Sequence, residues 1–259
     1  MTAATASAGL SGLANPTRFS ALAERILPWL WVAAAVTLGV GLWLAFSVPD
    51  DYQQGRTVRI MFVHVPAVWL AMGAYVAMVS GALGVLVWRH PLADVAARAA
   101  APLGAAFTFV GLATGSVWGR PMWGTWWVWD ARLTSFLVLL LIYLALIALW
   151  RGQDDPARSA RTGAILVLVG AVNLPIIKFS VDWWNTLHQP ASVLRMDGPA
   201  MPPVFLAPLL TMALAFLLLF AALHVQGMLN ELAARRIRAL EIRKARGTRG
   251  GPSRMVVGR

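Results

Sequence analysis

Six long runs of apolar residues constrain the fold of this chain more than any other feature. A run of about 20 apolar residues is what an α-helix needs to cross the hydrocarbon core of a bilayer. Only 13% of the 259 residues are charged and 59% are hydrophobic, which excludes a soluble globular enzyme. The sequence therefore predicts an all-α, polytopic integral membrane protein with six transmembrane helices. The predicted spans cover residues 28–48, 60–88, 99–117, 133–150, 162–181 and 203–225.

These spans divide the chain into a membrane domain and two tails. We expect an N-terminal tail at 1–27, a six-helix domain at 28–226 and a basic tail at 227–259. The first run is longer than the apolar core of a signal peptide and has no small-residue cleavage site, so it is interpreted as a retained helix. The largest segments on the side opposite the termini are a tryptophan-rich loop at 118–132 and a second loop at 182–202.

The distribution of Lys and Arg predicts the orientation. Because the number of spans is even, both termini share one side, where the tails and loops carry 16 Lys and Arg against 5 on the other. By the positive-inside rule, both termini are expected in the cytoplasm and the two loops in the periplasm. Most of the difference comes from the tail after Arg235, which is interpreted as a solvated anchor beside membrane lipids. The net charge of +11 is not evidence for a nucleic-acid partner.

Several kinds of chemistry are excluded by missing residues. The chain has no Cys, so thiol exchange, attachment of a cofactor through sulfur and thiolate metal sites are ruled out. It has no Gly-x-x-x-x-Gly-Lys-Ser/Thr segment for ATP and no His-Glu-x-x-His zinc motif. No nucleophile with a nearby base stands out either. We therefore predict a protein that is not an enzyme, with no catalytic residues.

Tryptophan is concentrated in the first of the two outer loops. Five of the 13 Trp lie within twelve residues: Trp118, Trp123, Trp126, Trp127 and Trp129. An aromatic belt at the membrane interface is the simpler alternative. The i, i+3 and i+4 spacing instead favours a short interfacial helix that lines up its indoles into a flat apolar surface for a planar aromatic ligand.

Charged residues flank this tryptophan run. Arg120 and Arg132 stand at its two ends, where they are expected to pair with carboxylates of the ligand. Asp130 has no second carboxylate near it in sequence. It is interpreted as a structural partner for an Arg or for backbone amides, within the ligand-binding loop, rather than as an acid catalyst.

The predicted topology sorts the four histidines into two pairs. His90 and His224 fall at inner span ends and are given no role, whereas His64 and His188 fall on the side of the tryptophan loop. A single His is more often structural than a ligand. Two neutral imidazoles beside a flat aromatic surface, however, predict axial ligation of a haem iron from opposite faces.

Glycine recurs every fourth residue in the third span. Gly111, Gly115 and Gly119 share one face with Gly104. Close helix packing is the favoured interpretation, and a dimer interface is the alternative.

Two segments resemble a known family. WGTWWVWDARLT at 123–134 resembles the tryptophan-rich "WWD" signature of haem-handling proteins in bacterial cytochrome c biogenesis. Within that superfamily, the Ala-Arg-Leu-Thr after Asp130 and the segment NLPIIKFSVDWWNTLHQ at 173–189 resemble the haem exporter protein C family, also called cytochrome c maturation protein C. Six spans in a chain of this length fit that family too.

The resemblance implies a role in haem delivery. It implies that haem b, as a transported ligand, is bound at the periplasmic face of the bacterial inner membrane by the tryptophan loop and by His64 and His188. It further implies handover to a periplasmic haem chaperone, protein E, within a complex of the ABC transporter proteins A and B and a small membrane protein D. A permease that moves haem or another solute across the membrane remains the alternative, although few polar residues lie within the spans.

Overall fold

The computed structural model describes residues 14–190, 192–193 and 195–249, and within them all regular secondary structure is helical. The elements are α1 (Pro16–Ser47), the 3-10 helix η2 (Arg56–Ile60), α2 (Met61–Leu86), α3 (Ala93–Trp123), α4 (Ala131–Gly152), α5 (Pro156–Gly170), α6 (Asn173–Trp183) and α7 (Pro203–Arg249). Six helical segments are long and apolar enough to cross a membrane, with η2 continuing into α2 and α5 and α6 counted together. The prediction of an all-α protein with six spans is confirmed.

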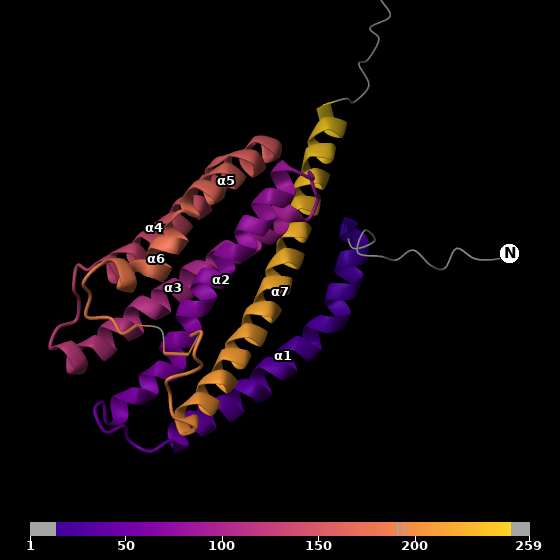
Figure 1. Ribbon diagram of the computed structural model, residues 1–259. Helices are drawn as coiled ribbons and strands as arrows, with labels where there is room; N and C mark the ends of the chain where they lie inside the picture. Colours follow the sequence, from indigo (N-terminus) through magenta and orange to yellow (C-terminus); the bar gives the residue numbers. More distant parts are fainter. Residues whose placement is uncertain (1–13, 191, 194, 250–259) are drawn as a thin grey trace, which may run out of the picture.

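The helices form an elongated bundle (Figure 1). α2 and α3 pack against each other in its middle, α1 pairs with α7 on one flank, and α4, α5 and α6 cover the other. Residues 48–55, 124–130, 184–190 and 195–202 gather at one end, which we call the loop end. The start of α1, the end of α7 and the connections 87–92 and 153–155 lie at the opposite end.

Two tyrosines join four helices at the centre of the core. The Tyr75 and Tyr143 rings meet edge to face with centroids 5.4 Å apart. The Tyr75 hydroxyl donates to the Val167 carbonyl on α5 at 3.1 Å, and the Tyr143 hydroxyl donates to the Ala71 carbonyl on α2 at 2.7 Å. α3 contributes Gly104, where a Cβ atom would lie 2.1 Å from Tyr143 Cζ. Both buried hydroxyls are therefore satisfied, as an apolar core requires.

The outer helices extend beyond the predicted spans. α1 begins at Pro16 rather than at residue 28, because the Asn15 side chain caps it by accepting from Thr17 N at 2.9 Å and Pro16 occupies its first turn. α7 continues to Arg249, well past residue 226. At about 1.5 Å per residue, its 47 residues span about 70 Å, roughly twice the thickness of the hydrocarbon core. The predicted tails are therefore partly helical, and residues 1–13 and 250–259 lie outside the described residues.

The tryptophan-rich segment also differs from its predicted form. α3 continues past residue 117 to Trp123 and ends at Gly124, which has a left-handed backbone with φ 77°. Trp118, Arg120 and Trp123 therefore lie on a helix rather than in a loop. The expected short helix across 123–130 does not form, since residues 124–130 contain no helix.

A break divides the fifth predicted span into α5 and α6. The helix ends at Gly170 and restarts at Asn173, whose side-chain amide donates to the Ser135 carbonyl on α4 at 2.9 Å. Pro175 lies in the first turn of α6, where a missing N–H leaves no hydrogen bond unmade. The polar Asn173 in this apolar run therefore holds α6 against α4.

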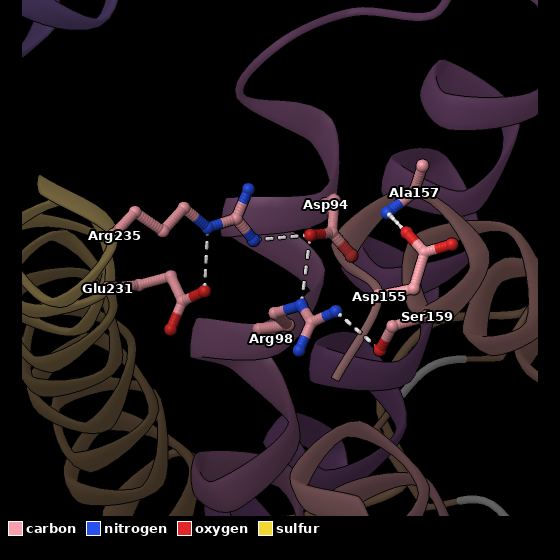
Figure 2. Close-up of polar contacts among 7 residues, drawn as sticks. All are labelled: Asp94, Arg98, Asp155, Ala157, Ser159, Glu231 and Arg235. Carbon is pink, nitrogen blue, oxygen red and sulfur yellow. Dashed lines mark hydrogen bonds and ion pairs between the residues drawn. The ribbon is translucent and has the colours of Figure 1, made fainter. Parts of the chain in front are cut away.

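A partly buried ion-pair network lies at the opposite end (Figure 2). Asp94 on α3 accepts from Arg98 Nε at 2.9 Å and also pairs with Arg235 on α7. Arg98 reaches the Ser159 hydroxyl on α5 at 2.9 Å, and Arg235 Nε pairs with Glu231 at 2.7 Å. The network joins three helices and matches two carboxylates with two guanidinium groups.

Candidate ligand-binding site at the loop end

His64 lies in the first turn of α2, half-buried against α3. Its Nδ1 atom is 3.0 Å from the Thr114 hydroxyl oxygen, and its ring meets the Trp118 ring edge to face with centroids 5.7 Å apart. A Cβ atom on Gly115 would lie only 3.1 Å from His64 Cε1. The second glycine of the repeat therefore makes room for an imidazole.

The other two glycines of the repeat also accommodate rings. A Cβ on Gly111 would lie 3.0 Å from Phe136 Cε1, and one on Gly119 would lie 3.0 Å from Trp123 Cε3. The glycine face of α3 thus packs tightly, as the sequence predicted, but against side chains of this chain.

His188 approaches from loop 184–202. Its Nδ1 atom lies 2.8 Å from the Gln189 carbonyl oxygen, and its backbone N–H donates to the Thr186 hydroxyl at 3.0 Å. Its ring centroid is 6.3 Å from that of Trp123. Burial lowers the pKa of the His188 ring and outweighs the Gln189 carbonyl, which raises it, while the Arg132 charge also lowers it. His188 is therefore held as a neutral imidazole at neutral pH.

The fold brings His64 and His188 to the same site. The two rings are close enough to interact electrostatically, although they lie on α2 and on a loop more than 100 residues later in the chain. A carbonyl oxygen only accepts, so the His188 proton is on Nδ1 and Nε2 keeps a lone pair. The assigned ring contacts within the described residues are made through Nδ1, to Thr114 for His64 and to the Gln189 carbonyl for His188, and the Gly111 carbonyl also faces the His64 ring.

The five tryptophans of residues 118–129 have different environments. Trp118 is half-buried and donates from Nε1 to Gln54 Oε1 at 3.1 Å, and Trp123 lies beside His188. Trp127 and Trp129 meet edge to face with centroids 5.4 Å apart. Trp126 and Trp129 are 58% and 75% exposed. The loop end therefore presents indoles to its surroundings, although without the helical alignment that the spacing had suggested.

One indole N–H of the tryptophan-rich segment has no hydrogen-bond partner within the described chain, as is also true of Trp150 at the opposite end. Trp127 Nε1 is buried and has no hydrogen-bond partner among the described residues. A buried N–H without a partner is unfavourable by about 1–3 kcal/mol, so it is a natural donor to an acceptor on a ligand.

Asp130 is occupied by the protein itself. One carboxylate oxygen caps α4 by accepting from Leu133 N at 2.8 Å, and the other accepts a hydrogen bond from the Thr186 hydroxyl. Since Thr186 also holds the backbone of His188, Asp130 links the tryptophan loop to the histidine loop. This arrangement matches the structural interpretation of Asp130 and places it beside the site without a free oxygen.

The two arginines predicted for ligand carboxylates differ in availability. Arg132 is half-buried and donates to the Ser180 hydroxyl at 2.8 Å and to the Lys178 carbonyl at 3.4 Å, both on α6. Arg120 is exposed and bonds only to the Gly124 carbonyl within the described chain. Among the described residues, no carboxylate oxygen lies within 4.0 Å of a guanidinium nitrogen of Arg120 or Arg132.

The other two histidines lie elsewhere. His90 is in the connection between α2 and α3 at the opposite end, where Nδ1 accepts from Leu92 N at 3.2 Å. His224 stacks on Phe220 with centroids 5.4 Å apart near the middle of α7, about 30 Å along the helix from Pro203. Their separation from His64 and His188 follows the sorting made from the sequence.

Several site residues escaped the sequence analysis. Thr114 gave no signal because the spans contain other Thr residues without a role at the site. Thr186 and Gln189 lie within three residues of His188, and proximity to a candidate ligand was the only clue that pointed to them. Gln54 lies outside the predicted spans in the connection before η2.

Comparison with known proteins gives a consistent result. A family model described as heme exporter protein C matches residues 9–243. A heme exporter protein C of Bradyrhizobium diazoefficiens is 64% identical over 236 residues, covering 91% of this chain and 90% of its own length. The protein of that name from Escherichia coli K12 is 49% identical over 222 residues, covering 85% and 89%. That from Paracoccus denitrificans is 45% identical over 235 residues, covering 90% and 97%.

Proposed function

Because the chain belongs to the heme exporter protein C family, we propose that it holds haem at the periplasmic face of the bacterial inner membrane and delivers it to a periplasmic haem chaperone. The single observation that carries this proposal is the meeting of His64 and His188 at the loop end. Both imidazoles make their assigned ring contacts through Nδ1 and lie beside tryptophans.

In this proposal the two imidazoles are the axial ligands of the iron of haem b. Neutral imidazole nitrogens are common haem ligands, and the low pKa of His188 keeps that ring in the ligating form. The indoles of Trp118 and Trp123 lie next to the two rings and provide apolar contact for the porphyrin. Trp126, Trp127 and Trp129 follow Trp123 in the chain and would add further aromatic contact, since Trp127 and Trp129 meet edge to face and Trp126 and Trp129 are exposed.

The propionates need donors at the edge of the same surface. Trp127 Nε1 and Arg120 are the best available, because the first is buried without a described partner and the second is exposed with only a carbonyl partner. Arg132 is already engaged with α6 and would have to exchange those hydrogen bonds. We therefore assign the first propionate contacts to Trp127 and Arg120. Asp130 and Arg132 would instead stabilise the surrounding loops and helices through their hydrogen bonds to Thr186 and Ser180.

Delivery fits a site that is open at its surface. A carrier has to release its ligand, and two of the five indoles are more than half exposed. We propose that the periplasmic chaperone, protein E, docks on this face. ATP hydrolysis would come from the transporter proteins A and B, with the small membrane protein D completing the complex. The chain itself acts without covalent chemistry on haem.

The visible absorption spectrum of detergent-purified protein tests this function. Wild type is expected to show a Soret band with low-spin bis-imidazole features after haem addition or chaperone co-expression. His64→Ala and His188→Ala should lose them, whereas His90→Ala and His224→Ala serve as matched controls and should retain them. Equal loss in all four variants would reject the site.

A colourless wild-type protein under both conditions would reject the holding function itself. A permease that moves haem or another solute would then become the better explanation. Transport of labelled haem into vesicles that contain this chain with its transporter subunits would measure that activity directly.

A further inference from the structure

We infer that Thr114 is a positioning residue for His64: its hydroxyl fixes the imidazole in the tautomer that offers Nε2 to the haem iron. This inference rests on the proposed function, since it gives His64 the iron as its ligand. Thr114 is on α3 and His64 on α2, so the contact also fixes the ring with respect to a second helix.

The hydrogen bonds around Thr114 determine the direction of each proton. Thr114 Oγ1 lies 2.6 Å from the Val110 carbonyl oxygen and 3.3 Å from that of Gly111. A carbonyl has no proton to give, so the single hydroxyl proton of Thr114 points to these carbonyls. Oγ1 is therefore the acceptor in its 3.0 Å contact with His64 Nδ1, and Nδ1 carries the proton.

The consequence for His64 follows from the chemistry of imidazole. A neutral ring carries one N–H, so protonation of Nδ1 leaves the lone pair on Nε2. Gly115 and Trp118 limit the rotation of the same ring. A Cβ atom added at Gly115 would lie 3.1 Å from His64 Cε1, and the Trp118 indole meets the ring edge to face with centroids 5.7 Å apart. Thr114 thus selects the ligating nitrogen while its neighbours fix its direction.

His188 reaches the same tautomer by a different route. Its Nδ1 proton is directed to the Gln189 carbonyl, which is a backbone group that mutation leaves in place. The two proposed axial ligands are therefore matched, each with Nδ1–H donating to oxygen. Such outer hydrogen bonds orient a ligating histidine and make it a stronger donor, and their loss typically weakens binding about 10–100-fold.

The first test needs no haem. In wild-type protein with ¹⁵N-labelled histidine, we expect His64, assigned by its loss in His64→Gln, to show the Nδ1–H tautomer. Thr114→Val removes the hydroxyl at nearly constant volume and should shift His64 toward Nε2–H. Thr114→Ser should restore the wild-type signal. Thr108→Val is the matched control, because Thr108 makes the same kind of bond to its own helix, to the Gly104 carbonyl at 2.6 Å.

The second test measures the effect on ligand binding by titration with ferric haem. Thr114→Val should weaken binding about 10–100-fold, reduce the low-spin fraction and raise the reduction potential, because a weaker donor stabilises ferric iron less. Thr114→Ser and Thr108→Val should bind like wild type. Wild type that takes up no haem would overturn the proposed function. Wild type that binds haem, with Thr114→Val unchanged in tautomer, affinity and spectrum, would overturn this inference alone.

Discussion

The Thr186 hydroxyl donates a hydrogen bond to the Asp130 carboxylate, and this contact joins the two loops that surround the candidate haem site. Thr186 in turn accepts from the backbone N–H of His188 at 3.0 Å. The position of a proposed iron ligand therefore depends on a residue of the tryptophan segment that itself has no free oxygen for the ligand.

Asp130→Asn tests this dependence. The amide can satisfy only part of the arrangement, because it has one acceptor oxygen in place of the two that accept from Leu133 N and from the Thr186 hydroxyl. We expect weaker haem retention and a loss of about 1 kcal/mol of stability from the missing hydrogen bond, while the α4 cap is kept because Asn caps a helix as well as Asp does. The haem-to-protein ratio after gel filtration and the melting temperature measure the two effects. Asp155→Asn makes the same substitution at the cap of α5, at the opposite end, and should leave haem retention unchanged.

Acid should release haem through His188. Burial lowers the pKa of His188 in the folded protein, so the unfolded chain binds a proton at a higher pH than the folded chain does. The free energy of unfolding therefore does not depend on this ring above about pH 6.5. It decreases as the pH falls below that value, because the unfolded chain takes up the proton more readily. A pH titration of the Soret band should therefore have its midpoint below about pH 6.5. A midpoint well above it would contradict the neutral, buried state of His188.

Gly115→Ala should disturb the iron site sterically. A methyl group there would lie 3.1 Å from His64 Cε1, so the ring or α3 has to shift by a few tenths of an ångström. We expect a smaller low-spin fraction in the absorption spectrum and weaker haem retention. Gly73→Ala on α2 is the control, since a Cβ there has no neighbour within 4 Å in the described chain. Identical spectra for both variants would argue against tight packing at His64.

The unpaired indole N–H predicts a role for Trp127 that depends on the propionates. Trp127→Phe keeps an aromatic ring but removes the buried donor. Loss of a hydrogen bond to a charged group is expected to weaken haem binding about tenfold or more. Haem dimethyl ester has no propionate charge, so the difference between wild type and variant should shrink with that ligand. Trp129→Phe, at an exposed position, provides the control.

The network at the opposite end should support the fold and leave haem binding unchanged. Asp94 is almost buried and faces both Arg98 and Arg235, so Asp94→Asn leaves Arg98 without a carboxylate partner and Arg235 with Glu231 alone. A destabilisation of about 3–5 kcal/mol is typical when a buried pair is broken. Thermal unfolding should show this loss, while the haem spectrum stays normal. Asp197→Asn, in the exposed Arg195–Asp197 pair, should have little effect on unfolding.

Much of this arrangement could be predicted because hydropathy and topology act over long stretches. Span length and the alternation of sides were enough to place His64 and His188 at one end and His90 and His224 away from them. An Asp directly before an apolar run is a helix-cap signal, and Asp130 behaves as one. The extra helical turns of α1 were missed because residues 16–27 are too polar for a span, although Asn15 and Pro16 together mark a helix start.

The residues that sequence reasoning could not find are those that act through single hydrogen bonds. Thr37, Thr108 and Thr211 all donate to a carbonyl of their own helix, as Thr114 does. Only the packing of α2 on α3 places an imidazole against the oxygen of Thr114. No local pattern distinguishes it from the other three.

The exposure of Trp126 and Trp129 has a kinetic consequence. A cofactor that a protein keeps permanently is enclosed on all sides, and its residence time is then set by how often the protein opens. Here the outer part of the aromatic surface faces its surroundings, at 58% and 75% exposure, while the two imidazoles lie deeper. In the proposed complex, an acceptor protein would contact the exposed edge of the haem before either iron bond breaks. Exchange would then proceed through a shared complex, and its rate would depend on the acceptor concentration.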